Sequence, residues 1–120
     1  MQQELPIDLC YEIIETERAY LIFLRLLWAA LKNEQKRRKQ YLKTKTHLET
    51  LKGNLQSEHM QFPSLVNNQA VIVATAEVSR LELLWINAKS DVRANRDAVL
   101  LGKKILRSLR VCLKASDISA

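Results

Sequence analysis

The chain has 120 residues, of which 48% are hydrophobic and 27% are charged, and its formal net charge at pH 7 is +6. One domain is expected at this length, and a hydrophobic fraction of this size excludes disorder over most of the chain. The surplus of positive charge favours anionic partners such as nucleic acid, acidic protein surfaces and anionic lipid, although a solvated charged surface accounts for it equally well.

Residues that break or turn a helix are scarce, since the sequence contains only two glycines and two prolines. Pro6 suits the first turn of a helix, where its missing N–H costs nothing. Pro63 is the only proline in the interior, and strong helix formers such as leucine, alanine, lysine and glutamate dominate on both sides of it. The sequence therefore predicts an all-α fold, a long antiparallel helical hairpin of the coiled-coil type.

We expect residues 1–115 to form a single helical domain. The first helix should run from about 6 to 60, a turn should occupy 61–64, and the second helix should run from about 65 to 114. The last residues, 116–120, should fray because nothing ties them down.

The first predicted helix carries an apolar seam with alternating steps of three and four residues, which is the heptad pattern of a coiled coil. Its members are Ile7, Cys10, Ile14, Leu21, Leu24, Trp28 and Leu31. Residues 32–40 contain nothing apolar, and the pattern then resumes in a shifted register. Its later members are Tyr41, Leu48, Leu51, Leu55 and Phe62. We expect one continuous helix through 32–40, and a helix–helix loop is the alternative.

Residues 19–31 are apolar nearly all round, so that a single neighbouring helix cannot cover them. Burying this surface requires either further folding of the chain or another subunit, which could be a second copy or a different protein. We therefore predict an apolar partner-binding surface in this stretch. Its residues are Leu21, Leu24, Leu27, Trp28 and Leu31.

Basic residues concentrate in residues 32–45, where Glu34 is the only acid. The candidates for binding nucleic acid or another anion are Lys36, Arg37, Arg38, Lys39, Lys43 and Lys45. They wrap most of the way around a helix, which phosphate neutralisation tolerates because it needs charge rather than a fixed geometry. Tyr41 is the only aromatic residue among them, so that base stacking has little support. A solvated surface is the simpler interpretation.

The second predicted helix matches the first when the two are folded antiparallel about Pro63, so that residue i faces roughly residue 125 − i. Its apolar pattern weakens through 87–97 and recovers from Val99 onward. The acidic residues at 12–17 then face the basic residues at 103–114.

A four-helix bundle is the alternative to the hairpin. It would break both long helices, near Asn33 and near Ser90, and it would explain why residues 19–31 are apolar on all sides.

Side chains that carry chemistry are few and form no catalytic or metal-binding pattern. His47 and His59 are twelve residues apart, with no carboxylate at ligand spacing beside either. Cys10 and Cys112 form neither a CxxC pair nor a metal spacing. In the hairpin they lie near one end, and we expect reduced thiols packed among apolar side chains. We therefore expect no enzymatic activity, no cofactor and no metal site.

The acidic start of the chain is unlike a secretory signal peptide, and its longest apolar stretch is too short and too polar to span a membrane. We expect an intracellular protein, cytoplasmic or nuclear, with no membrane span and no small-molecule substrate. The leading hypothesis is a non-enzymatic helical scaffold subunit that assembles with itself or with other coiled-coil proteins. The alternative is a small basic helical accessory protein that binds RNA or DNA through residues 32–45.

Overall fold

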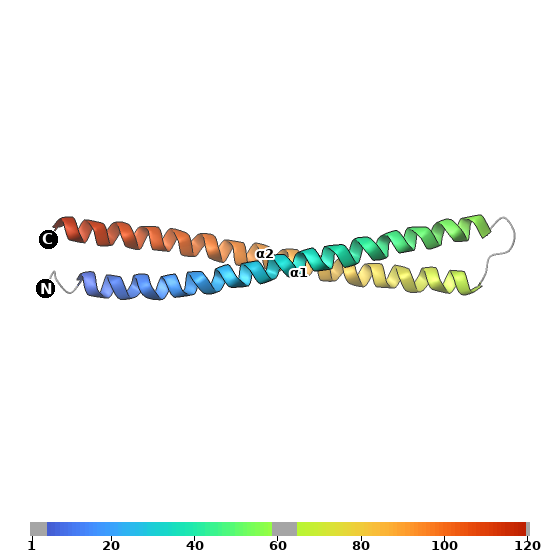
Figure 1. The fold of residues 1–120 in the computed structure, drawn as a ribbon, viewed down its shortest axis with the longest axis horizontal. Coiled ribbons are helices and arrows are strands. Elements are labelled where there is room, and N and C mark those ends of the chain that lie inside the picture. The colour runs from blue at the N-terminus through green and yellow to red at the C-terminus, as the bar shows by residue number, and fades with distance from the viewer. Residues whose placement is uncertain (1–4, 59–64, 120) are drawn as a thin grey trace. The chain divides into compact units, whose positions relative to one another are not determined.

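A computed structural model describes residues 5–58 and 65–119, and all of these residues are helical. Helix α1 spans Leu5–Glu58 and helix α2 spans Leu65–Ser119 (Figure 1). The prediction of an all-α fold is therefore confirmed. The turn expected at 61–64 lies outside the described residues. Helix α2 continues past the end expected at about 114 and includes most of the tail that was expected to fray.

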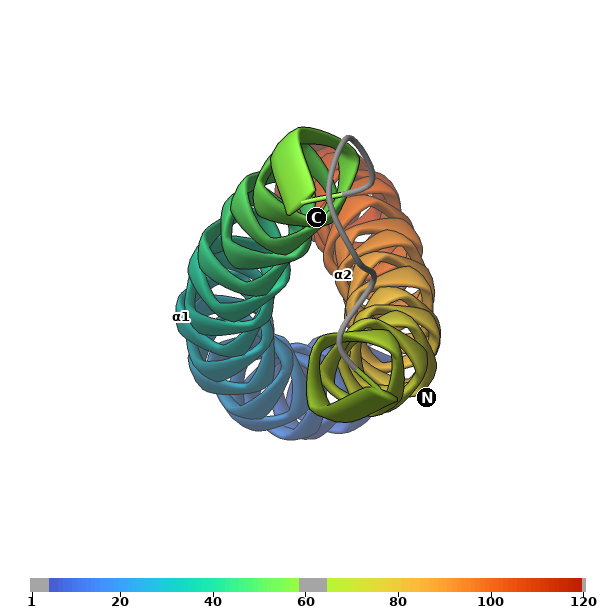
Figure 2. The same ribbon diagram turned by 90° about the vertical axis from the view of Figure 1, so that its right-hand side faces the viewer.

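The chain divides into two compact units, and in each of them a segment of α1 lies beside an antiparallel segment of α2 (Figures 1 and 2). Unit 1 contains Met1–Ala30 and Asp91–Ala120, and unit 2 contains Leu31–Ser90. Each unit is therefore built from residues of both helices.

Contacts between the helices agree with the expected pairing, in which residue i faces roughly residue 125 − i. In unit 1, Glu17 and Arg110 form an ion pair, and in unit 2 the rings of Tyr41 and Trp85 pack together. The antiparallel hairpin is thus confirmed. The four-helix alternative is wrong, because α1 continues through position 33 and α2 continues through position 90 without a break.

The core is a seam of side chains between the two helices. Its buried members are Ile13, Leu48, Ala74, Leu81, Ala88, Val92 and Leu106. On α1 the buried or half-buried positions include Ile13, Tyr20, Leu27, Glu34, Tyr41 and Leu48. On α2 they include Ala74, Leu81, Ala88, Asn95, Gly102 and Leu109. Both sets repeat every seven residues, which is the coiled-coil heptad, so the seam keeps one register along each helix.

The seam expected in the first part of α1 is wrong by about one residue. The exposed residues among those expected to pack inside are Ile7, Cys10, Ile14, Leu21, Trp28 and Leu31. The seam instead uses the neighbouring apolar set that contains Ile13 and Tyr20, because only that set is in register with Tyr41 and Leu48. The expected register shift at 32–40 is therefore absent from the seam.

The polar run at 32–40 is helical, so the loop alternative is wrong. Glu34 occupies the seam there, and its Oε1 accepts a 2.8 Å hydrogen bond from Trp85 Nε1. The Trp85 ring also packs at 5.2 Å between centroids against Tyr41, and Lys89 Nζ lies 4.0 Å from the indole centroid. A polar side chain is tolerated in a helix–helix seam when its hydrogen bonds are satisfied.

Gly102 occupies a seam position at which the facing helix supplies a large side chain. A Cβ atom at this glycine would lie 3.2 Å from Cδ2 of Tyr20, closer than ordinary van der Waals contact. The absence of a side chain at Gly102 therefore makes room for the tyrosine ring. Gly53 in α1 differs, because a Cβ atom there would meet nothing within 4 Å.

Alanine substitution at the two glycines should separate helix propensity from packing. Gly53→Ala should raise the free energy of unfolding by roughly 1 kcal/mol, because alanine favours the helix and the site has room. Gly102→Ala gains the same propensity but forces Tyr20 to move, so its gain should be clearly smaller or negative. Urea unfolding followed by circular dichroism, at one fixed protein concentration, measures both values. Equal gains at the two positions would contradict the packing of Tyr20 on Gly102.

Candidate functional site

Among the described residues, large exposed apolar side chains are more numerous in unit 1 than in unit 2. Among the described residues of unit 1, the large exposed apolar side chains are Ile7, Tyr11, Ile14, Leu21, Ile22, Phe23, Leu26, Trp28, Leu100, Leu101, Ile105 and Val111. In unit 2 they are Leu31, Leu42, Ile72, Val73, Leu83 and Ile86. A two-helix unit can bury only one stripe of each helix, so the additional apolar residues of unit 1 lie on its surface.

The five residues predicted to bind a partner are divided between the seam and the surface. Leu24 and Leu27 are half-buried in the seam, where they hold the two helices together. Leu21 and Trp28 are 54% and 63% exposed. Leu31 is also exposed, and it belongs to unit 2. Partner binding by the exposed residues stays a prediction.

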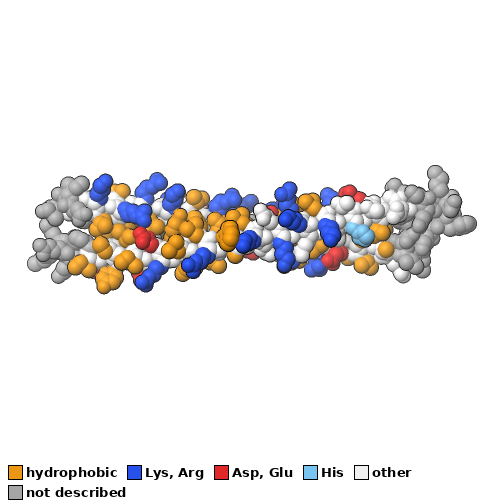
Figure 3. Space-filling view, viewed as in Figure 1, with side chains coloured by type: hydrophobic (Ala, Val, Ile, Leu, Met, Phe, Trp, Pro, Cys, Tyr) orange, Lys and Arg blue, Asp and Glu red, His pale blue; other side chains and the backbone are white. Residues whose placement is uncertain are grey.

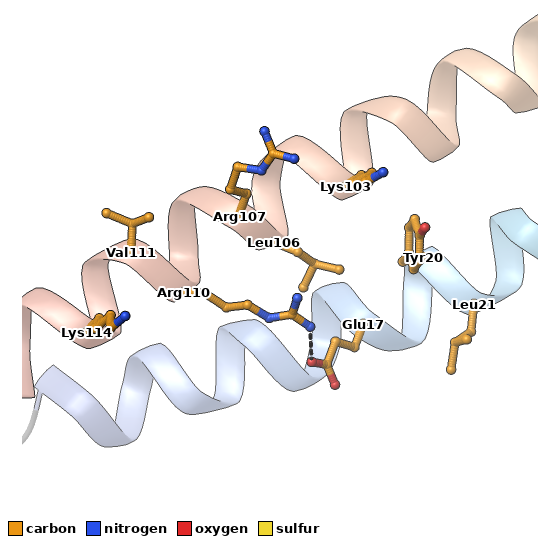
Figure 4. Close-up of a pocket in the computed structure, with 9 residues that line it drawn as sticks. All are labelled: Glu17, Tyr20, Leu21, Lys103, Leu106, Arg107, Arg110, Val111 and Lys114. Atoms are coloured by element: carbon orange, nitrogen blue, oxygen red, sulfur yellow. Dashed lines mark hydrogen bonds and ion pairs between the residues drawn. The ribbon is translucent and has the colours of Figure 1, made fainter.

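One side of unit 1 carries a groove of about 540 Å³, which we name the basic groove (Figure 4). Its lining residues are Glu17, Tyr20 and Leu21 from α1, and Lys103, Leu106, Arg107, Arg110, Val111 and Lys114 from α2. The four basic residues follow one another at steps of four, three and four, so they form one stripe along α2. In the space-filling view, Lys and Arg side chains gather along α2 of unit 1, while hydrophobic side chains are numerous on the visible face of α1 in the same unit (Figure 3).

The basic groove combines a positive rim with an apolar floor. Its only carboxylate is Glu17, whose Oε1 accepts a 3.0 Å hydrogen bond from Arg110 Nη2. Leu106 projects from α2 toward α1 and is 5% exposed, and Tyr20 rises beside it from the opposite helix (Figure 4). One carboxylate against four cations leaves a net positive charge over a hydrophobic surface, which suits a ligand that is both anionic and apolar.

A second groove of about 360 Å³ lies on the other side of the seam in unit 1, and we name it the apolar groove. Its lining residues are Glu15, Thr16, Ala19, Tyr20 and Phe23 from α1, and Ala98, Leu101, Gly102 and Ile105 from α2. The two grooves share only the seam residue Tyr20. The apolar groove contains one acid and no base, so the two sides of unit 1 differ in charge.

The acidic residues expected to face the basic stretch behave differently from one another. Glu17 reaches across to Arg110, as expected. Glu15 instead pairs with Arg18 on its own helix at 3.4 Å, and both side chains are highly exposed. Glu12 is also exposed. Ion pairing across the seam is therefore confined to Glu17 among these three, because the other two lie away from the seam on α1.

The six basic residues predicted at 32–45 do not form one surface. Arg37 is half-buried beside the seam and donates a 3.3 Å hydrogen bond to Gln40 Oε1, and the others are exposed. Only Arg37 and Lys43 of the six line a groove shared by the two helices. Lys45 Nζ lies 5.8 Å from the Tyr41 ring centroid. The segment therefore presents dispersed charges around α1.

The groove that contains Arg37 and Lys43 also has an internal ion pair. Arg80 donates two hydrogen bonds to the carboxylate of Glu77, one of them 3.0 Å from Nε to Oε2. These hydrogen bonds lower the pKa of Glu77 from its usual value. Part of the positive charge in this groove is therefore already neutralised by a carboxylate of the same helix.

The cysteine side chains differ from the expectation in their exposure, not in their place in the hairpin. Cys10 and Cys112 are free and exposed, so the expectation of thiols packed among apolar side chains is wrong. Within residues 5–58 and 65–119, no three His, Cys, Asp or Glu side chains cluster in a way that could hold a metal ion. In the same described ranges, neither helix contains a stretch long and apolar enough to cross a membrane.

Comparison of the chain with protein-family models found no match, and comparisons with curated proteins and with solved structures found none either.

Removing the acceptor of the Trp85 indole should weaken unit 2. We expect Glu34→Ala to lower the free energy of unfolding by about 1 kcal/mol, because a half-buried N–H loses its partner. Glu34→Gln keeps an oxygen acceptor for the indole N–H, so its free energy of unfolding should fall by less. Glu49→Ala, at an exposed position of the same helix, is the control and should change stability by less than about 0.5 kcal/mol. Urea unfolding measures all three, and equal losses in Glu34→Ala and Glu49→Ala would contradict this role.

Proposed function

We propose that the chain is a non-enzymatic helical interaction subunit that assembles with itself or with other helical proteins through unit 1. The observation that carries this proposal is the excess of exposed apolar side chains on unit 1, including Trp28 at 63% and Leu101 at 59% exposure. Exposed apolar surface of this extent on a folded unit is typical of a protein–protein interface. The place of action that fits two reduced, exposed cysteines is the cytoplasm or the nucleus.

The free energy available from this surface is large enough to drive association. Complete burial of a leucine or phenylalanine side chain stabilises by roughly 1.5–3 kcal/mol relative to full exposure. Leu101 and Phe23, which both line the apolar groove, retain much of that exposure in the isolated unit. Contact with further helices would remove them from water, as in a helical bundle.

Binding of RNA or DNA through residues 32–45 has less support. Arg37 is half-buried, and the remaining basic residues of that segment point around the helix rather than along one side. The contiguous stripe of positive charge lies instead in unit 1, where Leu106 and Tyr20 form an apolar floor. An apolar floor contributes nothing to the neutralisation of phosphates.

The state of association tests the proposed function directly. The isolated full chain should sediment as an oligomer at micromolar concentrations, because unit 1 alone leaves its apolar surface in water. Analytical ultracentrifugation over a range of concentrations gives the masses. A monodisperse, stable monomer throughout that range would contradict the proposal.

A pair of matched substitutions tests which of the two units mediates self-association. Leu101→Lys places a charge on the apolar surface of unit 1, and Leu83→Lys does the same at a residue of unit 2 that is 62% exposed. Leu101→Lys should weaken self-association at least about tenfold, the equivalent of losing 1.4 kcal/mol of binding. Leu83→Lys should leave it unchanged. The opposite ranking would show that unit 2, not unit 1, forms the interface.

A further inference from the structure

We propose that the occupant of the basic groove is a second copy of the chain, which inserts the acidic side of its own α1 there. The inference rests on the proposed function and deepens it by naming the partner and the two surfaces that meet. It starts from an imbalance of charge in the basic groove. Within the described residues, Glu17 is paired with Arg110, and no ion pair to a carboxylate is present for Lys103, Arg107 or Lys114.

The complementary surface is an exposed stripe on α1 of unit 1, which we name the acidic ridge. Its members are Asp8, Glu12, Glu15, Ala19, Ile22 and Leu26. They follow one another at steps of four and three, so they lie along one side of the helix. The ridge is acidic in its first half and apolar in its second half. All six residues are exposed, and none of them lies in the seam.

The ridge and the groove agree in length. A rise of 1.5 Å per residue gives about 10 Å between Asp8 and Glu15, and about 16 Å between Lys103 and Lys114. The three acids therefore fit within the span of the basic stripe.

Along the hairpin the acids are offset from the basic stripe by about one heptad, because Glu17 faces Arg110 and Glu12 therefore lies at the level of residue 115. Two copies side by side, pointing the same way and displaced along the helix axis by about 10 Å, would place the three acids next to the cations of the groove. The apolar half of the ridge would then reach the level of Leu100 and Trp28, which are 51% and 63% exposed.

A contact between the ridge of one copy and the groove of another gives the acids and the cations partners of opposite charge. A contact in which the same surface meets itself across a two-fold axis does not. Two basic grooves facing one another would repel, and two apolar grooves facing one another would leave Lys103, Arg107 and Lys114 without an anionic partner. A ridge-to-groove contact is heterologous, so each copy retains one ridge and one groove for further copies. The expected product is a ring or a filament rather than a closed dimer.

Two neutralising variants test the contact. The groove variant carries Lys103→Gln, Arg107→Gln and Lys114→Gln, and it leaves the Glu17–Arg110 pair intact. The ridge variant carries Asp8→Asn, Glu12→Gln and Glu15→Gln. All six side chains are exposed, so the fold should persist, which circular dichroism checks. A control variant with Lys36→Gln, Lys39→Gln and Lys43→Gln removes three positive charges from unit 2, the same number that the groove variant removes from unit 1.

The expected result is specific to a heterologous contact. In ultracentrifugation after nuclease treatment, the native chain and the control variant should form species larger than dimers, and higher salt should weaken them. Each of the other two variants alone should lose these species. A mixture of the two should form a 1:1 complex that grows no further, because it contains one intact ridge and one intact groove that can meet.

Other outcomes would overturn this contact and identify what replaces it. Assembly of both variants like the native chain would leave the proposed function standing and reject the ridge and groove. Assembly of the ridge variant alone would show that the groove binds a different surface. Assembly that is present before nuclease treatment and lost after it would reject the pairing and show that nucleic acid mediates the assembly. A mixture that stays monomeric would reject the pairing, and a monomeric native chain would reject both the pairing and the proposed function.

Discussion

A single seam between two helices is the constraint on which the other features of this protein depend. Each helix can turn only one stripe of side chains toward its neighbour, and here that stripe repeats every seven residues through Ile13 and Leu48 on α1 and through Ala74 and Ala88 on α2. Every other apolar side chain must lie on the surface. In unit 1 these side chains are numerous, so the hairpin fold by itself creates the surface that we propose as an interface.

Much of the fold could be predicted from the sequence, because it depends on where helices must stop. Only Pro63 interrupts the long run of helix formers, and that was enough to predict two antiparallel helices and their approximate facing. The seam in the first part of α1 could not be predicted in the same way. Apolar residues occupy two adjacent sets of positions there, and local periodicity does not distinguish Ile13 from Ile14. The choice is set further along the helix, by the register of Tyr41 and Leu48, and the same series contains Glu34, which accepts a hydrogen bond from Trp85.

The candidate site was harder to predict, because it depends on which side of each helix a side chain lies on, and that follows only from the correct seam register. The basic residues at 103–114 were visible in the sequence, but they were interpreted as ion-pair partners of the acids at 12–17. Only Glu17 lies near enough to the seam to reach them. Glu12 and Glu15 point elsewhere, which leaves one side of unit 1 basic and gives α1 an acidic ridge. A correct seam register, applied to the same sequence, would have separated these surfaces.

The contact between Tyr20 and Gly102 also limits how the two helices of unit 1 can slide past one another. A shift of α2 by one heptad would bring Asn95 or Leu109 opposite the tyrosine ring, and either side chain would occupy the space that the glycine leaves open. A two-helix coiled coil with a uniformly apolar seam has several alignments of similar free energy. The contact between Tyr20 and Gly102 disfavours the alignments that are shifted by one heptad. The shapes of the two grooves of unit 1 are thereby fixed in the isolated chain, which would reduce the entropy cost of the association that we propose.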